Sequence, residues 1–194
     1  MLRPVSWLLS CCYCSLFCFS QPPPATPMSE IVLYLHIVGA ITLFSGLVAA
    51  VVAMLRMERA AGETRCAMAA MARAMAAMAA GGGGLALLFG IYMVLNEAQY
   101  SFGQAWIDNS LGLLLVMVAV IPLVMVPRLR AIADGDGVIG DPVLWITTTT
   151  MLGAAFGIEY LMVAKPLAHG SDDGVLLLFL LLGAGAGWLR TREA

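Results

Sequence analysis

Two ionisable side chains lie inside long apolar stretches of the sequence, where such groups are rare. His36 is the only strongly polar residue of residues 31–55, and Glu159 lies near the end of residues 143–164. Ionisable groups are costly to insert into a membrane, and those that occur there mark ion, proton or ligand pathways. Because imidazole and carboxylate both bind metals and both transfer protons, these two residues predict a metal, proton or small-ligand site.

The same two residues also admit a purely structural interpretation. His36 and Glu159 could hydrogen-bond across two helices and thereby fix the register of those helices. The sequence leaves this interpretation open beside the functional one, and it names no cofactor and no catalytic residue. Four further polar residues belong to the same predicted layer, namely Asn96, Glu97, Tyr160 and Lys165.

Long apolar helices must position these residues. The 194 residues are 61% hydrophobic and 11% charged, with a mean hydropathy of +0.93, which is too apolar for a water-soluble globule. Residues 31–55 are long enough as a helix to cross a hydrocarbon core of about 30 Å. We therefore predict an all-α, polytopic transmembrane bundle with five spans, and the alternative is four spans followed by a C-terminal interfacial helix. The predicted spans are about 31–55, 74–96, 107–126, 143–164 and 174–189.

Residues 1–27 differ from the rest of the chain, and residues 28–194 are predicted to form a single membrane domain. The first segment runs from Arg3 through an apolar, cysteine-rich stretch to prolines at positions 22 to 24. It is either a signal peptide or a misassigned start, in which case Met28 opens the protein. Amino-terminal sequencing of the expressed protein distinguishes these two interpretations.

Positive charges fall on one side of the predicted topology. Between residues 28 and 194, only Lys165 is placed on the other side. Because lysine and arginine mark the cytoplasmic side, we predict a mature N-terminus outside, a C-terminus in the cytoplasm, and a bacterial inner membrane location. The arginines on the cytoplasmic side are Arg56, Arg59, Arg65, Arg73, Arg128, Arg130, Arg190 and Arg192.

Small residues mark the predicted helix–helix contacts. His36 shares one helical face with Gly39 and Gly46, so it should point into the bundle. Glycine-rich faces also fit a homo-oligomer or a partner in a membrane complex, beside the lipid bilayer itself. The remaining glycines of this kind are Gly81 to Gly84, Gly153 with Gly157, and Gly183, Gly185 and Gly187.

Methionines recur on one face of the second predicted helix. Met68, Met71, Met75 and Met78 have helical spacing. Thioethers are soft copper ligands, but no histidine or cysteine shares this face, so the pattern favours packing.

Several short motifs resemble those of a bacterial family of uncharacterised small integral membrane proteins, which is distantly similar to the copper-resistance protein D membrane domain. They are LHIVGA and FSGL at 35–40 and 44–47, GIYMV at 90–94, the Trp106 segment, Pro127 with Arg128, and LMVAKP at 161–166. The resemblance covers about residues 30–166. It implies a helical membrane bundle of four or more spans without an assigned activity.

Three classes of function follow from these observations. The first is a non-enzymatic, transporter-like or accessory membrane protein with an outward-facing site at His36 and Glu159. The second is a structural or assembly subunit of a membrane complex. The third is a redox or haem-binding subunit, which is disfavoured because His36 is the only histidine within a predicted span. No HExxH or P-loop pattern indicates an enzyme, and no basic run indicates nucleic-acid binding.

Overall fold

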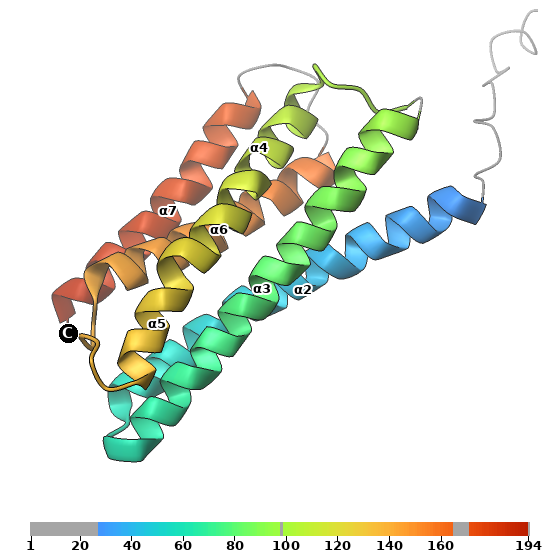
Figure 1. Ribbon diagram of the computed structural model, residues 1–194. Coiled ribbons are helices and arrows are strands. Elements are labelled where there is room, and N and C mark those ends of the chain that lie inside the picture. The colour runs from blue at the N-terminus through green and yellow to red at the C-terminus, as the bar shows by residue number, and fades with distance from the viewer. Residues whose placement is uncertain (1–26, 98, 165–170, 194) are drawn as a thin grey trace, which may run out of the picture.

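The computed structural model describes residues 27–97, 99–164 and 171–193, which form helices joined by short connections and contain no strand (Figure 1). Its helices form five long segments, because α4, η1 and α5 follow one another without a break. All five segments are long and apolar enough to cross a membrane, so the predicted five-span, all-α bundle is confirmed. The elements are α2 (Pro27–Arg59), α3 (Gly62–Asn96), α4 (Ala105–Val120), the π-helical turn η1 (Ile121–Met125), α5 (Val126–Ala133), α6 (Pro142–Ala164) and α7 (Ser171–Glu193).

Consecutive segments run up and down the bundle (Figure 1). The connections from α2 to α3 and from α5 to α6 lie at one end, together with the C-terminal end of α7. We call this end, which carries Arg59, Arg130 and Arg192, the arginine end. The connection from α3 to α4 lies at the opposite end.

The most extensive packing joins α2 to α3, and glycines make it possible. A Cβ atom at Gly39 of α2 would lie only 2.6 Å from the backbone nitrogen of Ala86. A Cβ at Gly82 of α3 would lie 2.6 Å from the nitrogen of Leu43. Since no hydrophobic driving force brings helices together in lipid, such close backbone approach supplies the van der Waals contact that does.

Only half of the four-glycine run takes part in helix packing. Gly82 and Gly83 are buried against neighbouring helices, whereas a Cβ atom at Gly81 or Gly84 would meet nothing within 4 Å. The predicted packing role is therefore confirmed for the two middle glycines. The outer two are turned away because consecutive helical residues point in different directions.

Alanines, rather than methionines, form the buried face of the first half of α3. Ala69, Ala72 and Ala76 are fully buried, while Met71 and Met78 are 48% and 39% exposed. The prediction that the methionine face packs inside the bundle is wrong for these two residues. The reason is that α2 and α3 approach too closely to accommodate long side chains at the contact.

The last helix packs lengthwise along α6. Gly157 faces Leu176, with a Cβ position 2.9 Å from that side chain, and Gly153 faces the backbone of Phe179. Further along, Gly183 faces the backbone of Thr149. This antiparallel contact makes α7 a member of the bundle, which rules out the alternative of an interfacial last helix.

Two prolines interrupt the third segment without ending it. Pro122 lies in η1, where the N–H of Val126 bonds to the carbonyl of Ile121, one residue further back than in an α-helix. Pro127 is the second residue of α5, and the helix then continues to Ala133. The third helix thus extends beyond the predicted span 107–126, because the π-helical turn shifts the backbone hydrogen-bond register beside Pro122, which lacks an N–H donor, and the helix continues.

Candidate functional site

His36 is held against the backbone of α3. Its Nδ1 lies 2.8 Å from the carbonyl oxygen of Ala86. Since a carbonyl only accepts hydrogen bonds, Nδ1 donates, and Nε2 of the neutral ring is left as an acceptor. The ring fits there because Gly90 has no side chain, and a Cβ at that position would lie 3.2 Å from Cε1 of His36. The prediction that His36 points into the bundle is confirmed.

His36 and Glu159 line the same cavity. The cavity measures about 300 Å³ and lies among α2, α3, α4 and α6, away from the arginine end. Most of its wall is apolar. We call it the histidine cavity, and its polar lining residues are His36, Tyr100, Trp106, Ser110 and Glu159.

No hydrogen bond or ion pair joins His36 to Glu159 within the part of the chain that the structure describes. Glu159 is exposed near the end of α6, and the histidine bonds to the α3 backbone instead. The interpretation as a direct cross-helix hydrogen bond is therefore wrong. The two residues come together only in that both line the same cavity.

Ser110 is a polar lining residue that sequence reasoning missed. Its side chain is only 1% exposed, and its hydroxyl has no hydrogen-bond partner among the described residues. Hydroxyls in membrane helices usually donate to the carbonyl one turn back, and those of Thr42 and Thr148 do so at 2.7 Å. A buried unpaired hydroxyl is costly, so Ser110 differs from these two threonines.

Three of the predicted supporting residues, Asn96, Glu97 and Tyr160, do not line the histidine cavity. The side-chain amide of Asn96 donates to the carbonyl of Tyr92 at 2.9 Å, within its own helix. Glu97 follows α3 as its C-cap, and Tyr160 is 45% exposed near the ring of Phe179. Lys165 lies outside the described residues. Two aromatic residues near the start of α4 line the cavity instead.

Tyr100 and Trp106 supply that aromatic wall. Their ring centroids are 6.3 Å apart and the ring planes meet at 77°, which is an edge-to-face pair. A useful sequence clue was the helical spacing of Trp106 and Ser110, which places both on one face of α4.

The donors in the cavity are few for a metal ion. Within residues 27–97, 99–164 and 171–193, no three histidine, cysteine, aspartate or glutamate side chains are grouped as a metal site. Met93 and Met162 also line the cavity and carry thioether sulfurs, which suit soft metals. His36, Met93 and Met162 lie on α2, α3 and α6, so no spacing in the sequence could indicate that they line one cavity.

Residues 30–136 match the model of a family described as Predicted integral membrane protein (DUF2269), which covers more than half of the chain. The chain belongs to this family. The resemblance to an uncharacterised integral membrane family is therefore confirmed, and a multi-pass membrane protein follows from the family and the helices together.

The family match contains four of the five polar lining residues, and Glu159 lies beyond it. Its description states no activity, and the distant similarity to copper-resistance protein D stays a prediction. No curated protein and no solved structure matches the chain.

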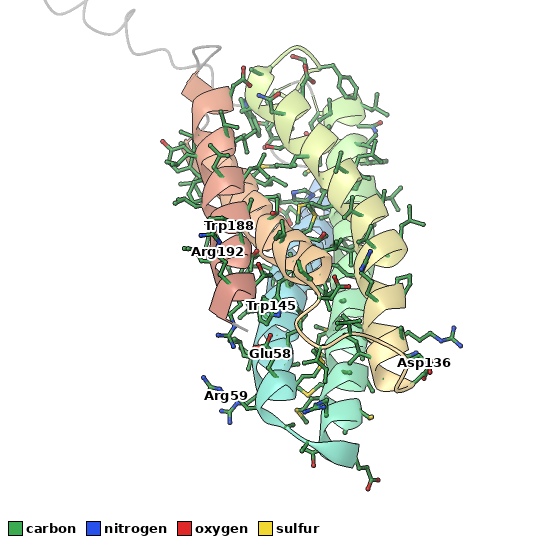
Figure 2. All side chains as sticks on the ribbon, turned by 90° about the vertical axis from the view of Figure 1, so that its left-hand side faces the viewer. Glu58, Arg59, Asp136, Trp145, Trp188 and Arg192 are labelled. Carbon is green, nitrogen blue, oxygen red and sulfur yellow. The ribbon has the colours of Figure 1, made fainter. Side chains whose placement is uncertain are left out.

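A cluster of three hydrogen-bonded side chains lies at the arginine end of the bundle. Trp145 of α6 donates from Nε1 to Oε1 of Glu58 at 2.7 Å, and Arg190 of α7 donates to the other carboxylate oxygen. The guanidinium carbon of Arg190 also lies 5.8 Å from the centroid of the Trp145 ring. We call these three residues the Glu58 cluster, and Figure 2 shows Glu58 and Trp145 facing one another between their helices.

The Glu58 cluster joins three helices, and none of its residues lines the histidine cavity. The Glu58 side chain is 9% exposed, and both of its oxygens accept hydrogen bonds. A buried carboxylate that is satisfied in this way holds elements in register. We therefore assign the cluster to the architecture and the histidine cavity to binding.

Proposed function

We propose that this integral membrane protein binds a small organic molecule in the histidine cavity and carries out no chemical reaction there. The observation that carries the proposal is the buried, unpartnered hydroxyl of Ser110 in a wall shared with His36 and Glu159. A ligand that hydrogen-bonds to Ser110 removes the cost of leaving this group unpaired.

The size and chemistry of the cavity support an organic ligand over a bare ion. Small-molecule sites measure roughly 300 to 1,000 Å³ and combine apolar walls with a few polar groups that fix orientation. The histidine cavity, at about 300 Å³, lies at the lower end of that range. A single metal ion would leave most of this volume empty, whereas a molecule of modest size fills it.

The position of the cavity supports access from outside the cell. It lies away from the arginine end, and positive charge is concentrated on the cytoplasmic side of membrane proteins. We accordingly propose a location in the inner membrane with the N-terminus of α2 outside and the C-terminus inside. The ligand then enters from the external face or from the outer leaflet.

Filling the cavity tests the proposal. The probe is 4-phenylbutanol, an apolar molecule with one hydroxyl, titrated into protein in lipid nanodiscs and followed by calorimetry against protein-free nanodiscs. The wild type should bind it saturably. Ala40→Phe, which places a ring at the cavity wall, should weaken binding at least about tenfold, since tenfold corresponds to only about 1.4 kcal/mol.

Ala119→Phe is the matched control, because Ala119 is exposed on α4 and does not line the cavity. It should bind the probe as the wild type does. Ser110→Ala should weaken binding by roughly five- to tenfold through the loss of one hydrogen bond. Equal binding by the wild type and Ala40→Phe would show that the probe occupies lipid or another surface and would overturn the proposal.

A further inference from the structure

We propose that the ligand of the histidine cavity is a monovalent organic cation, an inference that rests on the proposed function of that cavity. The first observation is its charge. Among the described residues, Glu159 is the only acidic side chain that lines the wall, and no lysine or arginine lines it. An anionic ligand would meet an uncompensated carboxylate, whereas a cation neutralises it.

The aromatic wall points to the same class of ligand. Tyr100 and Trp106 border the cavity, and tryptophan and tyrosine rings attract cations through their electron-rich faces. A carboxylate combined with two aromatic residues is the set of groups that recognises substituted ammonium ions. An inorganic cation would gain little from the apolar surface that makes up the rest of the wall.

The hydrogen-bonding groups of the cavity are matched to a donor on the ligand. Because Nδ1 of His36 donates to the carbonyl of Ala86, its Nε2 is an acceptor in the neutral ring. The carboxylate of Glu159 only accepts, and the hydroxyl of Ser110 can accept as well as donate. A protonated amine carries the N–H donors that these groups lack.

The number and position of charges limit the ligand further. A single carboxylate balances a single positive charge, so a dication would leave one charge unpaired in an apolar wall. Glu159 is exposed near the end of α6, while Leu114 and Ile107 of the wall are buried. The charged group therefore lies beside Glu159, and the apolar body lies deeper, against these two apolar side chains.

The test compares two probes of nearly equal shape in the same nanodiscs of zwitterionic lipid, namely 4-phenylbutylammonium and 4-phenylbutanol. The wild type should bind the ammonium at least about tenfold more tightly than the alcohol, as expected for a hydrogen-bonded charge. Glu159→Gln should abolish this preference and leave the affinity for the alcohol within about threefold of wild type. Retained alcohol binding also shows that the variant is folded.

Glu97→Gln is the matched control, since Glu97 lies at the same end of the bundle but does not line the cavity. It should keep the preference for the ammonium. Equal affinities for the two probes in the wild type, or a preference that survives Glu159→Gln, would overturn the organic-cation inference and leave the proposed function standing. Failure of both probes to bind the wild type would overturn both proposals.

Discussion

At the scale of single residues, Glu58 connects more of the molecule than its position suggests. One oxygen of its carboxylate accepts from Trp145 and the other from Arg190, which joins the end of α2 to the start of α6 and the end of α7. Hydrogen bonds to charged groups contribute more than neutral ones, because an ionised acceptor attracts the donor more strongly. The indole N–H of Trp145 should therefore stabilise the protein in addition to the packing of its ring.

Trp145→Phe tests this expectation, because it removes the indole N–H and keeps an aromatic ring. We expect it to lower the free energy of unfolding by about 1.5 to 3 kcal/mol, as a lower midpoint of thermal unfolding in detergent. Trp188→Phe is the control, since Trp188 is 46% exposed and its ring lies 3.6 Å from the guanidinium carbon of Arg192, a contact that phenylalanine retains in part. Similar midpoints for both variants would refute the role assigned to the N–H.

The residues of the Glu58 cluster could not be predicted as neighbours. Trp145 and Arg190 follow Glu58 by 87 and 132 positions, and no local spacing relates them. Ser110 was missed for a different reason, since a single hydroxyl in an apolar helix ordinarily bonds to its own backbone. His36 and Glu159 could be selected as candidate residues from the sequence, because an ionisable group within an apolar helix stands out whatever its separation from other such groups along the chain.

At the scale of helices, close backbone approach decides which face of each helix is buried. The contact between α2 and α3 is lined by glycines and alanines, and glycines also allow close approach where α6 meets α7. Longer side chains lie on the flanks, which explains why Met71 is exposed although its neighbour Ala72 is fully buried. A methyl group added at the contact would therefore overlap the backbone of the facing helix.

The four-glycine run offers a test within one turn of α3. Gly82→Ala would bring a methyl group to 2.6 Å from the nitrogen of Leu43, and we expect a loss of about 1 to 3 kcal/mol in stability through overpacking. Gly81→Ala meets nothing within 4 Å and should be neutral or stabilising by up to about 1 kcal/mol, since alanine favours the helix. Thermal unfolding midpoints of the two purified variants decide, and the opposite order would contradict this account of the contact.

The existence and number of helices could be predicted because each one is a continuous apolar run, and a membrane leaves the backbone no other regular solution than a helix or a closed barrel. Their exact contacts could not. The histidine cavity draws residues from α2, α3, α4 and α6, and its shape depends on how those helices cross. Sequence periodicity gives the inward face of a helix but not the angle at which two helices meet.

At the scale of the whole molecule, the two ends of the bundle differ in charge and in how far the helices extend. The helices α2 and α3 have 33 and 35 residues, so each is about 50 Å long, against a hydrocarbon core of about 30 Å. The hairpin between them extends beyond the other connection at the arginine end (Figure 1). That extension carries Arg59, Arg65 and Glu63, which fits an aqueous compartment.

The proposed orientation predicts which connections are accessible from outside the cell. In a background with all five native cysteines replaced by serine, a single cysteine introduced by Ser101→Cys or Asp136→Cys probes two exposed connections. An impermeant maleimide should label the first in intact cells and the second only after permeabilisation. The reverse pattern would invert the topology and place the histidine cavity on the cytoplasmic side.

The Glu58 cluster also constrains the order in which the protein is assembled. The helices α2 and α3, like α6 and α7, are neighbours in sequence, so each hairpin can close as soon as its second helix has been synthesised. Arg190 follows Glu58 by 132 positions and completes the cluster only after the helices between them have been synthesised. A nascent chain that stalls before Arg190 holds its early hairpin but lacks this closing bond.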